Sequence, residues 1–253
     1  MHAIVIPCFN EAMRFQEEPF AIALSANPKL HLCLVNDGST DETERVLQAF
    51  CDKHNQRTTL ISYHANRGKA EAVRAGILSC ADQPYEQLGY WDADLATPIE
   101  DLPLLVNSLN HDPSLDMVLG SRVRMLGHQI ERRMLRHYVG RAFATLASLS
   151  LDLPVYDTQC GAKVFRNAPW TIPLFQSPFV SGWAFDIELL SRYLVHCKQA
   201  GHQPKLLEVP LRQWHDVAGS KVSPIDGIKA SAALLRLARS HRKAMRCDST
   251  AGD

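Results

Sequence analysis

The segment Leu30-His-Leu-Cys-Leu-Val-Asn-Asp-Gly-Ser-Thr-Asp41 decides the fold. Its first six residues are almost all apolar, and a short apolar run of this kind predicts a buried strand. Residues 40–54, which follow, carry apolar side chains on one helical face and predict a helix. Gly38 supplies the turn between the two, and Ser39 or Thr40 supplies a side chain that caps the helix. The segment therefore predicts one strand followed directly by one helix.

The same alternation continues on both sides of this segment. Apolar runs predict strands over residues 3–7, 58–63, 88–91 and 116–119, and apolar periodicity predicts a helix over residues 69–79. A further helix is expected to begin with Thr97 as its cap, Pro98 at its first position and Glu100 completing a capping box. Apolar strands that alternate with helices indicate an α/β fold, with a mostly parallel twisted sheet and helices on both faces.

The second half of the chain is less regular. Its patterns predict helices over residues 130–149, 184–199 and 225–246, and a strand over residues 205–214. No internal repeat and no linker rich in Gly, Pro or Ser divides the chain. We therefore expect one domain that ends in a helix.

The composition excludes several classes of protein. With 27 Lys+Arg against 27 Asp+Glu in 253 residues, the formal net charge is zero, which argues against a general nucleic-acid binder. A hydrophobic content of 46% argues against a disordered chain. No apolar run approaches the roughly 20 residues that span a bilayer, and no basic segment precedes the first strand as in a signal peptide. The scattered cysteines form no C-x-x-C pair and are typical of reduced thiols. We expect a cytoplasmic enzyme.

Polar residues follow three of the predicted strands, at the point where each strand ends. Pro7-Cys-Phe-Asn-Glu11 follows the first strand, Asn36-Asp-Gly-Ser-Thr-Asp41 the second, and Asp92-Ala-Asp94 the fourth. Ligands of parallel α/β sheets bind at the carboxyl ends of the strands. We therefore expect the three clusters to meet in one crevice.

Asp92 and Asp94 are candidate ligands of a divalent metal ion. Residues i and i+2 of an extended strand end point to the same face, so we expect the two carboxylates to lie side by side. Two like charges held close together are costly unless a cation lies between them, and Mg²⁺ and Mn²⁺ take oxygen ligands. For a lone D-x-D sequence a solvated turn would be favoured by roughly ten to one. The neighbouring clusters favour a metal site here.

Two further polar positions are candidate ligand contacts. Asp37 is left at the tip of the second strand, where we expect its carboxylate to be free to accept hydrogen bonds from a nucleobase or ribose. In Asn66-Arg-Gly-Lys69, backbone N–H groups and the Lys69 ammonium stand at the start of a predicted helix, which is typical of an anion site. The alternative that the residue is only a solvated cation of the loop remains open for Arg67 and is less favoured for Lys69.

Taken together and in this order, these motifs resemble the family 2 glycosyltransferases of GT-A fold. They are Pro7-x-Phe9-Asn10-Glu11, Val35 to Asp41, Asn66-x-Gly68-Lys69 and Asp92-Ala93-Asp94. Later segments resemble the branch that holds the dolichyl-phosphate β-glucosyltransferases and other polyprenyl-phosphate glycosyltransferases. These are Gly120-Ser-Arg122, Asp157-Thr-Gln-Cys-Gly-Ala-Lys163, Trp183 to Leu190 and Gly219-Ser-Lys221. The resemblance extends over residues 2–224.

The resemblance implies an inverting, metal-dependent enzyme that takes a hexose from a nucleoside-diphosphate sugar. UDP-glucose is the favoured donor and GDP-mannose the alternative. We expect Asp37 and the Pro7 backbone to hold the nucleobase, Asn10 and Glu11 to assist at the base or ribose, Asp92 to orient the ribose or the metal, and Asp94 to bind Mg²⁺ or Mn²⁺. The GT-A domain would span residues 1–224, with a donor-binding half up to about residue 122 and an acceptor-side half over 123–224.

The acceptor is inferred from charge. A hydroxyl acceptor needs a general base, whereas a phosphate acceptor is already anionic and needs cations. Arg132 and Arg136 stand four residues apart on one predicted helix, a like-charge pair that an anion between them would stabilise; Arg133 is better explained as an exposed cation. Together with Arg122 and the Ser220-Lys221 pair, these cations favour a polyprenyl phosphate. Asp157 and Asp186 remain candidates for a base, or for partners that orient Arg122 and Lys221.

Two other functions stay open, namely a glycosyltransferase that acts on a soluble hydroxyl acceptor and a non-catalytic sugar-nucleotide-binding protein. A dinucleotide oxidoreductase is excluded because no G-x-G-x-x-G follows a strand, and no Walker A sequence occurs. Residues 225–253 are expected to form a basic amphipathic helix and a disordered tail. The helix would lie on an anionic membrane, so that the protein is peripheral on its cytoplasmic face, or it would be a solvated or dimer-forming helix. Its cations are Lys229, Arg236, Arg239, Arg242, Lys243 and Arg246.

Overall fold

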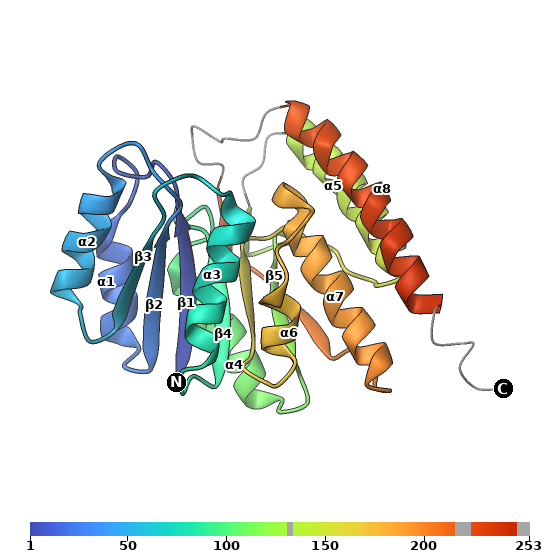
Figure 1. The fold of residues 1–253 in the computed structure, drawn as a ribbon, viewed down its shortest axis with the longest axis horizontal. Coiled ribbons are helices and arrows are strands. Elements are labelled where there is room, and N and C mark those ends of the chain that lie inside the picture. The colour runs from blue at the N-terminus through green and yellow to red at the C-terminus, as the bar shows by residue number, and fades with distance from the viewer. Residues whose placement is uncertain (131–133, 216–223, 247–253) are drawn as a thin grey trace.

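A central sheet with helices on both sides forms the body of the molecule (Figure 1). The structure is a computed structural model that describes residues 1–130, 134–215 and 224–246, without the side chains of 134–139, 183, 224–233 and 246. The strands of the central sheet are β1 (His2–Cys8), β2 (Leu30–Asn36), β3 (Thr58–Ser62), β4 (Gln87–Trp91), β5 (Met117–Ser121), β7 (Ala162–Arg166) and β8 (Leu206–Pro210).

The sheet has seven strands in the order β3-β2-β1-β4-β7-β5-β8. All neighbours are parallel except at β7, which runs antiparallel to both β4 and β5. The mostly parallel sheet predicted from the sequence is therefore confirmed. β6 (Gln129–Ile130) and β9 (Gln213–Trp214) form a separate parallel pair.

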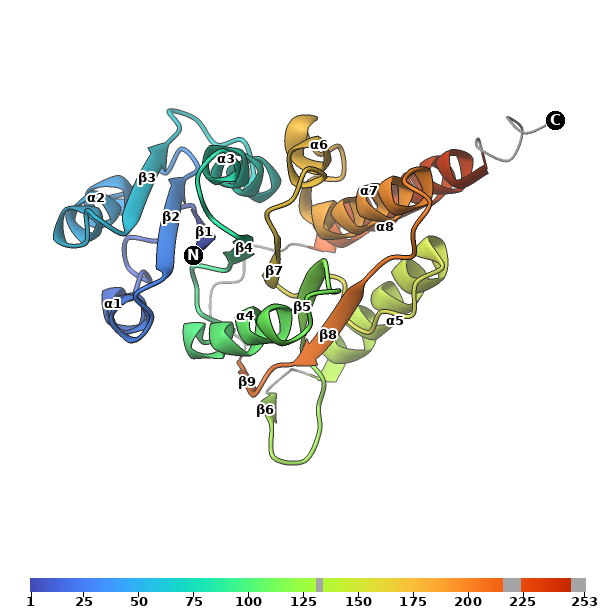
Figure 2. The ribbon, with the colours of Figure 1, turned by 90° about the horizontal axis from the view of Figure 1, so that it is seen from below.

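Alternate side chains of each strand enter two hydrophobic clusters on opposite faces of the sheet. In β1, Ile4 and Ile6 belong to one cluster, and Ala3 and Val5 belong to the other. The Ile4 cluster is covered by α1 (Glu17–Ala26), α2 (Thr43–Lys53) and α4 (Leu102–His111). The Ala3 cluster is covered by α3 (Lys69–Ala81), α6 (Thr171–Gln176) and α7 (Phe185–Gln199), as Figure 2 shows. Helices on both faces are thus confirmed.

The two remaining helices pack beside α7. α5 (Met134–Leu151) and α8 (Pro224–Arg246) lie against each other, and α8 also lies along α7 (Figure 1). In α8, the side chains of Leu234, Ala238 and His241 are buried. The C-terminal helix is therefore part of the packed structure, while residues 247–253, where a disordered tail was expected, lie outside the described residues. Within the described part of the chain, no helix combines the length and the apolar character needed to cross a membrane.

The helix start predicted at Thr97 is wrong. Thr97 is buried, and its carbonyl accepts a hydrogen bond from Trp91 Nε1 at 2.7 Å. Pro98 takes an extended ψ of 139°, so no helix can run through it; a single 3₁₀ turn, Ile99–Asp101, follows. The α-helix begins only at Leu102, with a proline in its first turn. That proline is Pro103, which the sequence analysis did not consider.

Two more boundaries differ from the predictions. The helix expected from residue 130 begins at Met134, because Ile130 belongs to β6. The single strand expected over 205–214 is two strands, β8 and β9, in different sheets. Asp101 Oδ2 accepts the Arg212 N–H at 2.9 Å and so diverts the chain between them. α1, β7 and α6 were not predicted from the sequence.

Candidate active site

The first two polar clusters interlock at the carboxyl edge of the sheet. Asp37 N donates to Cys8 O at 2.8 Å, and Asn10 N donates to Ser39 Oγ at 2.9 Å. The Asn10 carboxamide oxygen accepts from Thr40 N at 2.8 Å. Asn10 holds this position with a φ of 50°, a left-handed conformation that Asn tolerates better than most residues. The structure therefore brings these two clusters together, as expected.

Glu11 is also tied to the second cluster. Its N–H donates to Thr43 Oγ1 at 2.7 Å, and its carboxylate pairs with Arg14 at 2.5 Å. Pro7 lies two residues before the first cluster's Phe9 and pairs in register with Val35 of β2. Contacts of Asn10, Glu11 and Pro7 with a nucleotide stay predictions, because their observed partners belong to the protein itself.

Asp37 is not free, contrary to the expectation. Its carboxylate accepts hydrogen bonds from Asn66 Nδ2 at 2.9 Å and from the backbone N–H groups of Arg67 and Gly68, each at 2.8 Å. The side chain is buried, and this burial raises the pKa of Asp37 although the two backbone N–H donors lower it. Asp37 therefore fixes the loop that leads into α3. A contact with a nucleobase would have to be made beside these bonds.

The Asp37 loop connects the second cluster to the third. Gly68 takes a φ of 94° and is followed by Lys69, the first residue of α3. The Lys69 ammonium lies 2.5 Å from Asp92 Oδ1. Partial burial lowers the pKa of Lys69, but the carboxylates of Asp92, Asp186 and Asp94 raise it more, so that the pKa lies above its ordinary value. Lys69 therefore stands among acidic side chains at the carboxyl end of β4.

Asp92 and Asp94 do not lie on an extended strand end, so that premise of the prediction is wrong. The chain turns after Asp92: Leu95 N donates back to Asp92 O at 3.3 Å, and Leu95 takes a φ of 52°. Asp94 Oδ1 accepts the Ala96 N–H at 3.1 Å. The turn forms here because Trp91 is fully buried and its ring nitrogen holds Thr97, which brings the chain back toward β4. Both carboxylates remain partly exposed.

Gly161 forms the other side of the Asp92 carboxylate. Its carbonyl accepts the Asp92 N–H at 3.1 Å. A Cβ added at Gly161 would lie 2.0 Å from Asp92 Oδ2, so no side chain larger than hydrogen fits here. This cradle and its two hard oxygen donors suit a divalent ion. Among the described residues no group of three or more His, Cys, Asp and Glu could hold a metal, so further ligands would come from a diphosphate or water.

Arg122 and Asp157 form a bidentate ion pair. Arg122 Nε lies 2.6 Å from Asp157 Oδ2, and its Nη2 lies 2.8 Å from Oδ1. Glu208 holds Asp157 in place, because it accepts the backbone N–H groups of Tyr156 and Asp157 at 2.6 and 2.8 Å. Burial lowers the pKa of Arg122, but the Asp157 carboxylate raises it more, so that the pKa lies above its ordinary value. Asp157 was expected to be either a base or a partner that orients a cation, and in the structure it is the partner of Arg122.

Asp186 is likewise paired with a cation, but with one that the sequence analysis did not name. Lys163 Nζ and the Tyr90 hydroxyl both donate to Asp186 Oδ1, each at 2.5 Å. Lys163 is fully buried, and its ammonium also donates to Cys160 O at 2.6 Å. Burial raises the pKa of Tyr90, and the Asp186 charge raises it further, so the hydroxyl keeps its proton. Asp186 thus anchors β4, β7 and the turn before Gly161.

Several predicted acceptor residues cannot be placed. Arg132, Ser220 and Lys221 lie outside the described residues, and so does the side chain of Arg136. Their roles stay predictions. The structure instead adds Gly161, Lys163, Tyr90 and Glu208. Gly161 and Lys163 belong to the Asp157–Lys163 motif, but their roles come from Asp92 and Asp186, which only the fold brings beside them.

Interlocked loops at the carboxyl edge of a mostly parallel sheet, with a D-x-D turn beside the lysine that begins α3, are the arrangement expected of a GT-A glycosyltransferase. The family model described as glycosyl transferase family 2 matches residues 3–170. The chain belongs to this family.

Curated relatives, of whose length this chain covers about 70%, support this assignment. A dolichyl-phosphate beta-glucosyltransferase of Trichomonas vaginalis is 32% identical over 248 residues, covering 92% of this chain and 69% of the relative. The enzyme of the same name from Saccharomyces cerevisiae is 29% identical over 259 residues, covering 92% and 72%. That from Mus musculus is 29% identical over 238 residues, covering 88% and 69%.

Solved structures share the fold. Glucosyl-3-phosphoglycerate synthase from Mycobacterium tuberculosis, in complex with Mn²⁺, UDP-glucose and phosphoglyceric acid, superposes with a TM-score of 0.65 at 18% identity. The match covers 94% of this chain and 80% of that one. The same enzyme with UDP gives a TM-score of 0.64. At this identity the likeness concerns the fold alone.

Proposed function

We propose that this glycosyltransferase moves glucose from UDP-glucose to the phosphate of a polyprenyl phosphate. A phosphate oxygen of the acceptor attacks the anomeric carbon from the face opposite UDP, the bond from that carbon to the diphosphate oxygen breaks, and UDP leaves with the electron pair. The configuration at the anomeric carbon is therefore inverted. The names of the curated relatives support both the sugar and the acceptor class.

At the donor side, Asp92 and Asp94 are the side chains that would hold Mg²⁺ or Mn²⁺. When bound, such an ion offsets the negative charge that builds on the leaving diphosphate. Lys69 adds a cation at the N-terminus of α3, where backbone N–H groups favour an anion. The solved relatives with UDP and Mn²⁺ or Mg²⁺ support this donor chemistry. GDP-mannose is the alternative donor.

At the acceptor side, the main support for the proposal is that both candidate bases are paired with cations. Asp157 is held bidentately by Arg122, and Asp186 is buried against Lys163 and Tyr90. A carboxylate held in this way is poorly suited to take a proton from a hydroxyl, because protonation would remove the charge that holds the ion pair together. A phosphate acceptor needs no such base. The pairing therefore favours polyprenyl phosphate over a soluble hydroxyl acceptor.

The test compares two acceptors that differ only in the phosphate. The protein is incubated with UDP-glucose and Mn²⁺, and UDP release is measured with farnesyl phosphate, with farnesol, or with neither. We expect release that depends on farnesyl phosphate and not on farnesol. Release driven by farnesol would favour a hydroxyl acceptor, and no acceptor-dependent release from any donor would favour the non-catalytic sugar-nucleotide-binding protein.

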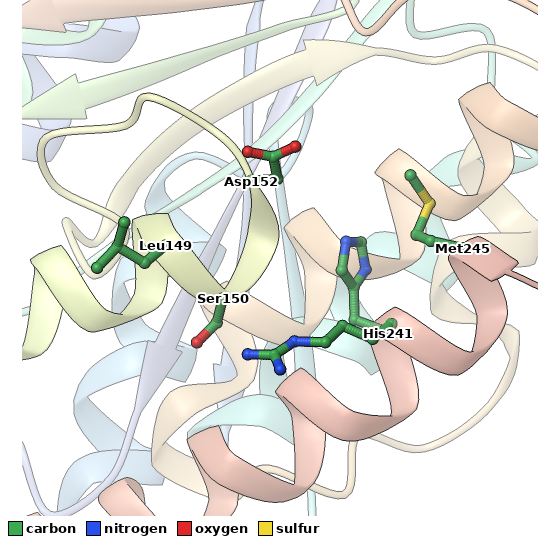
Figure 3. Close-up of a pocket in the computed structure, with 6 residues that line it drawn as sticks. Leu149, Ser150, Asp152, His241 and Met245 are labelled. Atoms are coloured by element: carbon green, nitrogen blue, oxygen red, sulfur yellow. The ribbon is translucent and has the colours of Figure 1, made fainter.

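We also propose that the face formed by α5 and α8 rests on the cytoplasmic side of an anionic membrane. α5 exposes a stripe of Ala142, Thr145, Leu146 and Leu149 at helical spacing. α8 exposes Leu235 together with the cations Arg236, Arg239, Arg242 and Lys243. The two helices meet at a pocket of about 220 Å³ whose lining includes Leu149 and Arg242. Figure 3 labels Leu149 and His241 at this pocket. An apolar stripe beside a row of cations suits a surface of anionic lipid.

A further inference from the structure

The Lys69 ammonium pairs with Asp92, one of the two side chains that would hold a metal ion. It lies 2.5 Å from Asp92 Oδ1. Gly161 closes one side of this carboxylate so tightly that an added Cβ would lie 2.0 Å from Oδ2. Lys69 stands on a side of the carboxylate that Gly161 leaves open, so a divalent ion that binds Asp92 there would meet the ammonium. The ammonium and a divalent ion cannot share one carboxylate oxygen closely without strong repulsion.

The backbone before Lys69 is held by hydrogen bonds, whereas the Lys69 side chain is partly exposed. The loop before it is fixed, because Asp37 accepts the N–H groups of Arg67 and Gly68. The side chain, in contrast, is 40% exposed and is attached to the first residue of α3. A lysine side chain has a flexible stem, so its ammonium can leave Asp92 without disturbing the helix.

We propose that Lys69 is a displaceable counter-ion: it neutralises Asp92 in the empty enzyme, yields that carboxylate to the entering divalent ion, and then binds the donor diphosphate. This inference rests on the proposed metal site. Its consequence is a pair of effects with opposite signs. Lys69 weakens the binding of metal alone, since an ion pair must first be broken, and it strengthens the binding of nucleotide once metal is present.

The test uses Lys69→Met and measures Mn²⁺ alone by electron paramagnetic resonance, then UDP at saturating Mn²⁺ by calorimetry. Removal of a partly exposed ion pair should tighten Mn²⁺ binding by about 2- to 5-fold. UDP binding should weaken by about tenfold, as expected when a charge-assisted contact is lost. Lys53→Met is the matched control, because Lys53 pairs with Glu17 on the surface at 2.7 Å, and it should change neither affinity.

The outcomes separate the two proposals. If the wild-type protein binds no Mn²⁺, or if Asp94→Asn does not remove the Mn²⁺ that it binds, the metal site itself is wrong. If Mn²⁺ binds in an Asp94-dependent way but Lys69→Met leaves its affinity unchanged or weakened, the counter-ion inference is wrong. Tighter Mn²⁺ binding with unchanged UDP binding would overturn the transfer of Lys69 to the diphosphate.

Discussion

Gly161 lies against Asp92 so closely that the Asp92 carboxylate fills the place of a Gly161 side chain. The Asp92 N–H donates to Gly161 O, and an added Cβ would meet Asp92 Oδ2 at 2.0 Å. One residue directly before β7 thus sets the position of an acidic side chain directly after β4. The glycine is required for space, not for backbone conformation.

We predict that Gly161→Ala displaces the Asp92 carboxylate and lowers Mn²⁺-dependent glucosyl transfer at least tenfold. The overpacked contact should also cost about 1–3 kcal/mol of stability. Gly140→Ala is the control, since an added Cβ there meets nothing within 4 Å. It should keep full activity and gain up to about 1 kcal/mol, as expected for Gly→Ala in a helix. Full activity of Gly161→Ala would contradict the positioning role.

The buried pair of Lys163 and Asp186 should be strongly coupled. Lys163→Met leaves the Asp186 carboxylate buried without its cation, and we expect a loss of about 3–5 kcal/mol in the free energy of unfolding. Adding Asp186→Asn to that variant should restore at least about 1 kcal/mol, because no buried charge then remains. Urea unfolding of both single variants and the double variant measures this coupling. Additive losses would show that the two groups do not depend on each other.

Stability should fall with acid because of His2. Burial, followed by the positive charges of the N-terminus and Lys29, lowers the pKa of His2 from 6.5 to about 4, although Glu86 opposes this. The folded protein keeps the ring neutral, and the unfolded chain binds a proton below pH 6.5. The contribution of the neutral His2 ring to the free energy of unfolding is therefore fully present above pH 6.5. It is lost as the pH falls toward 4, and the loss is about 2–3 kcal/mol. Urea unfolding of His2→Gln should show a flatter pH dependence, and an unchanged slope would be against this origin.

Binding of the α5–α8 face to lipid should depend on charge. Arg239→Glu/Arg242→Glu should weaken co-sedimentation with anionic vesicles by about tenfold or more, since each cation near the surface contributes about 1 kcal/mol. Added salt should also weaken the binding of the wild-type protein to these vesicles. Arg45→Glu/Lys53→Glu on α2 changes the net charge equally and should bind like the wild type. Equal losses in both double variants would point to net charge alone.

The sequence predicted most strands of the sheet, and their mostly parallel direction, because these strands are almost uniformly apolar. The runs ending at Pro7, Val35 and Trp91 lie in β1, β2 and β4, and the polar residues after them face one edge. Such runs are short and bounded by turn residues, so local pattern suffices. The same pattern explains why Lys69 was correctly expected at the start of a helix.

The parts that escaped prediction depend on contacts between distant segments. β7 contains Lys163 at a fully buried position, and a charged residue in a strand reads as exposed unless its partner Asp186 is known. Asp37 was expected to be free because its donors lie in another loop, at Arg67 and Gly68. The turn after Asp92 depends on Trp91 and Thr97, whose hydrogen bond no local pattern reveals.

The most direct test of the account is the coupling between metal and nucleotide at Asp94. UDP is titrated calorimetrically into the wild-type protein and into Asp94→Asn, each with and without Mn²⁺. We predict that Mn²⁺ tightens UDP binding at least tenfold in the wild type and that Asp94→Asn abolishes this gain while UDP alone binds both proteins alike. An equal gain in the Asp94→Asn variant, or no gain in the wild type, would contradict the assignment of the metal and diphosphate to this turn.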